Sequence, residues 1–236
     1  RTRQNGSLDR ATQTLRDAAH VLSADIAAAL PDSVAIRGDT ALDLHAHVGA
    51  SVVCVVSGLA LVLPGSATTA AIPFSFWREA PDVGDVLAVW DSTTGGRWYV
   101  SSINAVSIAT DGAGCATTSG FRTPVDSVAR VAVTRVRVAA SFPAGVGVGA
   151  PVRVFRPVRW TLYRGSDRTW SIGYRRCPRG SCGSVQPVTG PLASAPDSGL
   201  VFSNAAPGVV GFSVRAPLVV GADVQKFRNV MLQRGI

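Results

Sequence analysis

Apolar residues recur at three- and four-residue steps near the start of the chain, from Ser7 to Leu30. This period predicts one amphipathic helix over residues 7–30, with an apolar stripe on about a third of its circumference. Ser7 is the expected N-cap, Asp9 falls in the first turn, and Pro31 ends the run. The side chains expected to pack the helix against the rest of the protein are Leu8, Leu15, Leu22 and Ile26.

The rest of the sequence follows a two-residue alternation that is typical of strands. In Ala41–Val48, Leu42 and its alternate neighbours face inward, and the polar residues between them face outward. The clearest hairpin runs from Val158 to Tyr174 and turns at residues 165–168. A slip in the alternation near Thr134–Arg135 predicts a β-bulge. Further strands are expected at 33–37, 52–56, 59–63, 86–90, 98–108, 128–138, 200–203, 209–216 and 227–233, and loops at 110–120, 142–151 and 177–198.

These elements predict one α+β domain over residues 1–236, in which a helical spine, residues 7–30, packs on antiparallel sheets in a β-rich head, residues 33–236. Hydrophobic residues make up 47% of the chain and charged residues only 16%, so a sizeable core can form. No apolar run reaches the roughly 18 residues that cross a bilayer.

The net charge of +8 is unevenly distributed. Residues 1–118 hold seven arginines and eleven acids, whereas residues 119–236 hold fifteen arginines, one lysine and four acids. Most of these arginines are dispersed along strands, as on a solvated sheet face. Nucleic acid, anionic lipid and an acidic partner are the alternatives, with Arg175, Arg176 and Arg179 as the candidate anion or partner surface.

Four cysteines allow three disulfide connectivities, of which Cys54–Cys115 with Cys177–Cys182 is the simplest. Neither pair has the CxxC spacing that zinc favours. Disulfides imply an oxidising, extracytoplasmic location, so we expect a targeting segment ahead of Arg1.

Catalytic signals are sparse. Asp43, His45 and His47 form a DxHxH pattern on one strand face, the best metal-ligand cluster available, although outward histidines of this kind are more often inert. Glu79, Asp82, Asp85 and Asp91 are the carboxylates from which a catalytic pair would have to be assembled. No nucleophile elbow or phosphate-binding loop occurs. We therefore expect a structural or assembly protein with no enzymatic activity, no metal and no cofactor.

The order of several stretches resembles a known family. A basic stub, RTRQNG, precedes the helix LRDAAHVLSADIAAAL, and the hairpin VRWTLYRGSDRTWSIGYRR is followed by QPVTGPL and GLVFSN. In this order they resemble the type IV pilin-like superfamily, above all the minor pseudopilin J of type II secretion and PilW-type minor pilins. The resemblance lies in residues 7–36 and 155–203, about a third of the chain.

The resemblance implies a pilin-like fold and a membrane-anchored precursor whose hydrophobic N-terminal segment would precede Arg1. It implies a subunit at or near the tip of a pseudopilus or pilus that primes assembly by packing with other minor subunits. The implied localisation is extracytoplasmic, in a periplasmic or cell-surface filament anchored in the inner membrane. The alternative is a pilus-associated adhesin or DNA-binding tip protein that uses the arginine-rich C-terminal half.

Overall fold

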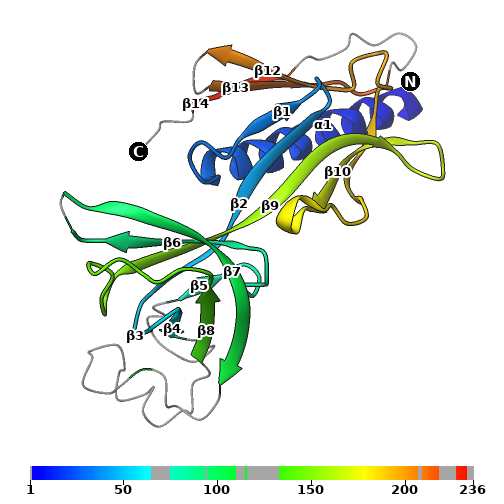
Figure 1. Ribbon diagram of the computed structural model, residues 1–236. Coiled ribbons are helices and arrows are strands. Elements are labelled where there is room, and N and C mark those ends of the chain that lie inside the picture. The colour runs from blue at the N-terminus through cyan, green and yellow to red at the C-terminus, as the bar shows by residue number, and fades with distance from the viewer. Residues whose placement is uncertain are drawn as a thin grey trace. The chain divides into compact units, whose positions relative to one another are not determined.

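The computed structural model describes residues 2–64, 75–93, 95–109, 115, 133–206, 209–217 and 227–232; the side chains of 2–8 and 227–232 are excepted. One α-helix lies within these ranges, α1 (Thr2–Ala28) (Figure 1). The strands are β1 (Ala35–Arg37), β2 (Ala41–Val52), β3 (Val55–Ser57), β4 (Ala60–Pro64), β5 (Phe76–Trp77), β6 (Val86–Asp91), β7 (Arg97–Ala109), β8 (Val133–Val138), β9 (Pro151–Arg164), β10 (Trp170–Arg176), β11 (Gln186–Leu192), β12 (Leu200–Ala206), β13 (Val209–Val214) and β14 (Phe227–Leu232).

The expected α+β, pilin-like fold class is wrong. Strands make up 52% of the chain and helix 13%, and eleven strands belong to one antiparallel sheet. Its order is β1-β2-β9-β6-β7-β8-β4-β3, with β10 and β11 joined to β9 and β5 to β2, while β12, β13 and β14 form a second sheet. The strand content exceeds the expectation because segments read as loops are extended: Gln186–Leu192 is β11, although it contains two prolines and a glycine. Strand β9 likewise begins at Pro151, the last residue of the expected loop 142–151, and runs on into the hairpin.

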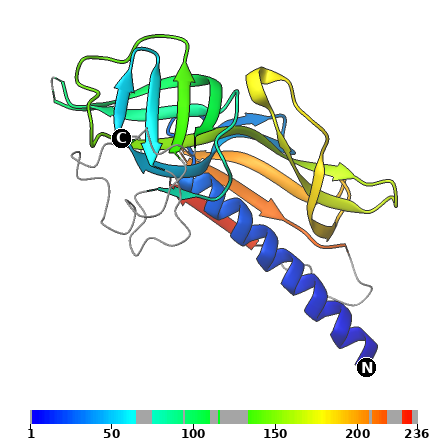
Figure 2. The ribbon, with the colours of Figure 1, turned by 90° about the horizontal axis from the view of Figure 1, so that it is seen from below.

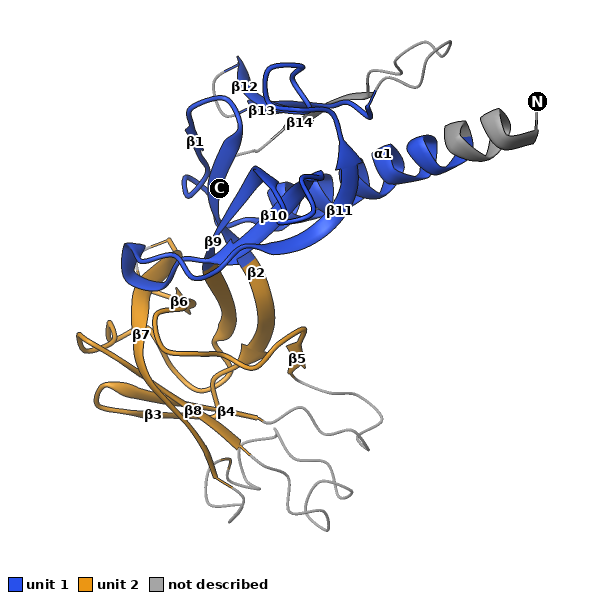
Figure 3. Cartoon of the chain, turned by 90° about the vertical axis from the view of Figure 1, so that its right-hand side faces the viewer, with its two compact units in different colours: residues 1–46, 157–236 blue, residues 47–156 orange. Residues whose placement is uncertain are grey.

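The chain divides into two compact units (Figure 3). Unit 1 comprises residues 1–46 and 157–236, and unit 2 comprises residues 47–156. Strands β2 and β9 each contribute residues to both units. The expected single domain stays a prediction.

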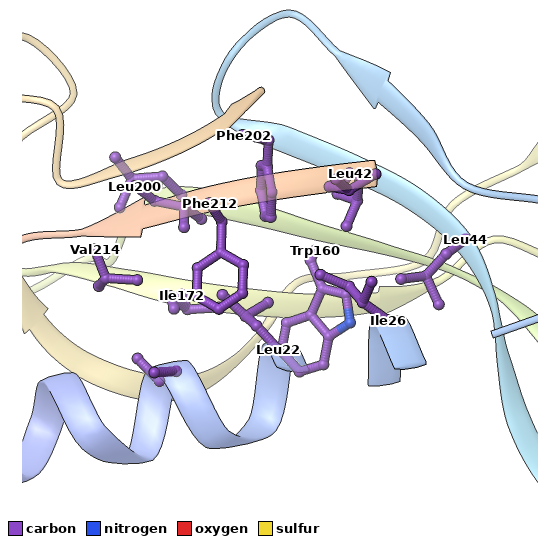
Figure 4. Close-up of a cluster of buried hydrophobic side chains, with 14 of the residues drawn as sticks. Leu22, Ile26, Leu42, Leu44, Trp160, Ile172, Leu200, Phe202, Phe212 and Val214 are labelled. Carbon is purple, nitrogen blue, oxygen red and sulfur yellow. The ribbon is translucent and has the colours of Figure 1, made fainter. Parts of the chain in front are cut away.

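The core of unit 1 is built around the second half of α1. Leu15, Leu22 and Ile26 are almost completely buried, whereas the side chain of Leu8 lies outside the described residues. Figure 4 shows Leu22 and Ile26 among Phe212 and Trp160 of the strands. Each buried leucine or isoleucine contributes about 1.5–3 kcal/mol, so this face is what holds the helix in unit 1.

Helix α1 differs from its expected bounds at both ends. It begins at Thr2, so Ser7 is an internal residue and not the N-cap, and no acid lies in its first turn. It ends at Ala28, shortly before Pro31, which has no N–H to donate. The Ser33 hydroxyl then accepts from the His45 N–H at 3.1 Å, which ties the helix exit to β2. Among the described helices, none has both the length and the apolar character of a membrane span.

Unit 2 encloses a core of its own, rich in valine and leucine, between two parts of the large sheet. Strands β6 and β7 form the hairpin expected around residues 92–96, with Trp90 opposite Trp98. Strand β7 then pairs with β8, and the register shifts between Ile103 and Ala105. The irregularity therefore lies on β7 and not at Thr134–Arg135 of β8, where the sequence predicted a bulge; β8 pairs with β4 in continuous register.

Candidate functional site

Charged side chains form a row across neighbouring strands of unit 1. The Asp43 carboxylate of β2 accepts hydrogen bonds from Arg159 of β9 (Nη2 to Oδ2 2.8 Å, with Nε on Oδ1) and from Arg37 of β1 (Nε to Oδ2 3.0 Å). Arg159 and Arg175 are directly opposite each other in the β9–β10 register. We call Arg37, Asp43, Arg159 and Arg175 the arginine row.

The arginine row carries three guanidinium groups and one carboxylate, so it has a net charge of +2. Hydrogen bonds from Arg159 and Arg37 lower the pKa of Asp43, which keeps this carboxylate ionised. Among the residues that the structure describes, Arg175 has no carboxylate partner of its own, and its buried Nε lacks a hydrogen-bond acceptor. Opposite residues on an antiparallel pair have Cβ atoms about 5 Å apart, where like charges repel. A carboxylate or phosphate group from outside would relieve this repulsion.

The structure separates the three arginines expected to form one surface. Successive residues of a strand point to opposite faces of the sheet, so Arg175 and Arg176 diverge. Arg175 lies opposite Arg159, whereas Arg176 lies opposite the core residue Val158. Arg179 follows in an exposed turn, with a positive φ of 52°. Arg175 thus belongs to the arginine row, whereas Arg176 points to the other face and Arg179 lies in the turn.

A disulfide holds this turn. Cys177 pairs with Cys182 across five residues, and the Cys177 N–H donates to the Pro157 carbonyl at 2.8 Å. In unit 2, Cys54 pairs with Cys115, and their side chains pack with Val62 and Val133. These are the two pairs that the spacing predicted as the simplest connectivity. They indicate an oxidising, extracytoplasmic environment.

The DxHxH pattern does not gather into a metal site. Asp43 already binds two guanidinium groups. Burial lowers the pKa of His45, and its buried Nδ1 has no hydrogen-bond partner. Burial, with the charges of Arg153 and Arg78, lowers the pKa of His47. No group of three potential ligands occurs within the part of the chain that the structure describes.

Sequence reasoning missed a buried ion cluster in unit 2. Arg156 donates to both oxygens of Asp85 (Nε to Oδ1 2.9 Å, Nη2 to Oδ2 2.8 Å), to the Ala80 carbonyl and to Glu79. Arg156 and Asp85 are each only 3% exposed. Two of the carboxylates considered for a catalytic pair therefore neutralise one arginine. The available signal was Arg156 itself, a charged residue at the point where three successive residues of β9 are buried.

The arginine row is the main cluster of charged side chains described in unit 1. The arginine row offers charge and hydrogen-bond donors, and it presents no paired nucleophile and base among the residues that form it. Comparison of the chain with known protein families, curated proteins and solved structures finds no match. The functional argument therefore rests on the chain's own residues.

Proposed function

We propose that the chain is a non-enzymatic subunit of an extracytoplasmic filament, of the minor pilin or pseudopilin kind. In this role it acts at or near the tip of a type II secretion pseudopilus or type IV pilus, and primes assembly by packing with other minor subunits. The proposal draws on the order of sequence stretches, the two disulfides and helix α1.

The observation that carries the proposal is the uneven burial of α1. Among residues 9–28, whose side chains the structure describes, full burial starts at Leu15, and Ala11 packs half-buried against the core. The helix nevertheless begins at Thr2, so nine residues, about 14 Å of helix, precede Ala11. Figure 2 shows this first part of α1 extending past the strands of unit 1. A regular helix that continues beyond its own core is suited to packing against neighbouring subunits.

The proposal includes where the protein is located in the cell. We propose that a hydrophobic segment ahead of Arg1 anchors the precursor in the inner membrane, and that the mature subunit enters a periplasmic or cell-surface filament. Other minor subunits and the filament itself would then be the partners.

Site-specific photo-crosslinking tests the proposal in cells that make the full protein. A photoreactive residue at Gln13, exposed on α1 and hydrogen-bonded only to Asp17 of the same helix, is expected to give adducts with other filament subunits. The matched control is Arg168, exposed in the β9–β10 turn. Adducts from both positions alike, or from neither, would contradict a packing role for α1.

The arginine row favours a second candidate function, a tip protein that binds a polyanion such as DNA. Arg175 lies opposite Arg159 and pairs with no carboxylate among the described residues. Binding should then weaken steeply with salt, because arginines that contact phosphates displace counterions. A gel shift that is lost on changing Arg159 and Arg175 to glutamine would support this function. A shift that ignores these changes would count against it.

A further inference from the structure

A hollow of about 400 Å³ opens on the face of unit 2 formed by β7, β8, β4 and β3. Figure 3 shows these strands in unit 2. Its lining includes Arg135, Arg137, Leu59, Ala60, Ala105 and Ser107. All of these residues belong to unit 2. The volume lies within the range of small-molecule sites.

Strand pairing explains the shape of the hollow. Arg137 of β8 lies between Ala60 of β4 and Ala105 of β7, its direct partners on the two sides. Arg135, two residues earlier, has Ser107 as its partner on β7. Two long side chains thus rise from the middle strand while their neighbours on β7 are short, which leaves open space beside them. Residues two apart on one strand face are about 6.6 Å apart, so both guanidinium groups can reach one oxyanion.

These two arginines differ from the other arginines described in unit 2. Arg97 pairs with Asp91, Arg153 lies over the Trp98 ring, and Arg156 binds Asp85. Arg78 also has an interaction partner. Arg135 and Arg137 are exposed and pair with no acidic side chain among the described residues. Among the described arginines of unit 2, the two without a partner of this kind therefore lie together in this hollow.

We propose that this hollow binds a small amphiphile with one oxyanion head and a short alkyl body. The head would lie between Arg135 and Arg137, which donate charge-assisted hydrogen bonds to it. The alkyl body would cover Leu59, Ala60 and Ala105. None of the described residues that line the hollow is aromatic, so they do not offer the stacking that single-stranded nucleic acids use. This inference is independent of the filament role.

Calorimetric titration of the full chain tests the inference, with decanoate and decyl phosphate as probes below their micelle concentrations. Both should bind. Decanol, which lacks the oxyanion head, and inorganic phosphate, which lacks the alkyl body, should each bind at least about tenfold more weakly. Arg135→Gln/Arg137→Gln should abolish decanoate binding. Ala105→Leu, which fills the hollow and keeps both charges, should weaken decanoate far more than inorganic phosphate.

Arg168→Gln is the matched control, since it removes the same charge from an exposed turn of unit 1. It should bind decanoate like the unaltered protein. Equal affinity for decanol, or unchanged binding after the double arginine substitution, would overturn the proposal. Stronger binding of an acidic peptide than of either amphiphile would overturn it as well, by assigning the hollow to a protein partner. Thermal unfolding of each variant checks that the fold is retained.

Discussion

Replacing Arg156 by methionine should be among the most destabilising single changes in unit 2. The substitution leaves Asp85, which is 3% exposed, as a buried carboxylate without its arginine. Removing one partner of a buried ion pair costs about 3–5 kcal/mol. We expect the lower end, about 3 kcal/mol, because Asp85 keeps the hydrogen bond from the Asp82 N–H at 2.9 Å and the side chain of Glu79 is 49% exposed. With a urea slope of about 2 kcal/mol per molar, the unfolding midpoint falls by about 1.5 M.

The measurement is equilibrium urea unfolding at pH 7, followed by circular dichroism and by tryptophan fluorescence. Arg153→Met is the matched control on the same strand; Arg153 is exposed and stacked on Trp98, so its loss should cost under about 1 kcal/mol. The double variant Arg156→Met/Asp85→Leu should recover most of the lost stability, since it removes both charges. A double variant as unstable as Arg156→Met would refute the reasoning, because an uncompensated carboxylate would then not be the cause.

Three further predictions concern stability. Leu22→Ala should lower the free energy of unfolding in urea by about 3–5 kcal/mol, because Leu22 is fully buried among large side chains. Ile108→Ala, at a residue that is 65% exposed, should lower it by under about 1 kcal/mol. Equal losses would contradict the assigned core. Asp43→Asn should cost under about 1 kcal/mol near neutral pH, because the ion pair is partly exposed. The pKa of Asp43 is lowered on folding, so the two proteins should differ in free energy of unfolding above pH about 4. This difference should vanish as the pH falls through the folded-state pKa. A difference that grows in acid would contradict the pairing. Replacing Cys54 and Cys115 by serine should lower the free energy of unfolding by about 4 kcal/mol, because this disulfide closes a loop with a sequence separation of 61. Replacing Cys177 and Cys182, with a separation of 5, should lower it by about 2 kcal/mol. Thermal unfolding of the two variants should show the larger loss for the first.

The sequence predicted those features that depend on local periodicity. The three-to-four-residue step places Leu15, Leu22 and Ile26 on the buried face of α1, as the structure does. The two-residue alternation of Ala41–Val48 matches the burial pattern along β2. Cysteine spacing anticipated both disulfides. In each case the signal lies within a few residues of the feature or in a short count of alternatives.

The features that sequence reasoning missed depend on partners far along the chain. Gln186–Leu192 looks like a loop because of its prolines and glycine, yet it becomes β11 by pairing with β10. The helix start was placed too late because Asn5 and Gly6 are weak helix formers, although nothing in that segment breaks a helix. The Arg156–Asp85 pair joins residues 71 apart, and the hollow at Arg135 and Arg137 exists only once β4, β8 and β7 are in register. Pairing of this kind leaves no local pattern.

The two-part composition of unit 1 has a consequence for the order of folding. Unit 2 is one continuous stretch, residues 47–156, so all of its contacts become available when its last strand has been synthesised. Unit 1 joins the first 46 residues to residues 157–236, and Leu22 meets Phe212 only after the chain between them has emerged. Contacts between such distant residues form late, because the intervening chain must first be closed into a loop. The apolar stripe of α1 therefore stays exposed to solvent until residues 157–216 have been made, and exposed apolar surface of this kind promotes aggregation.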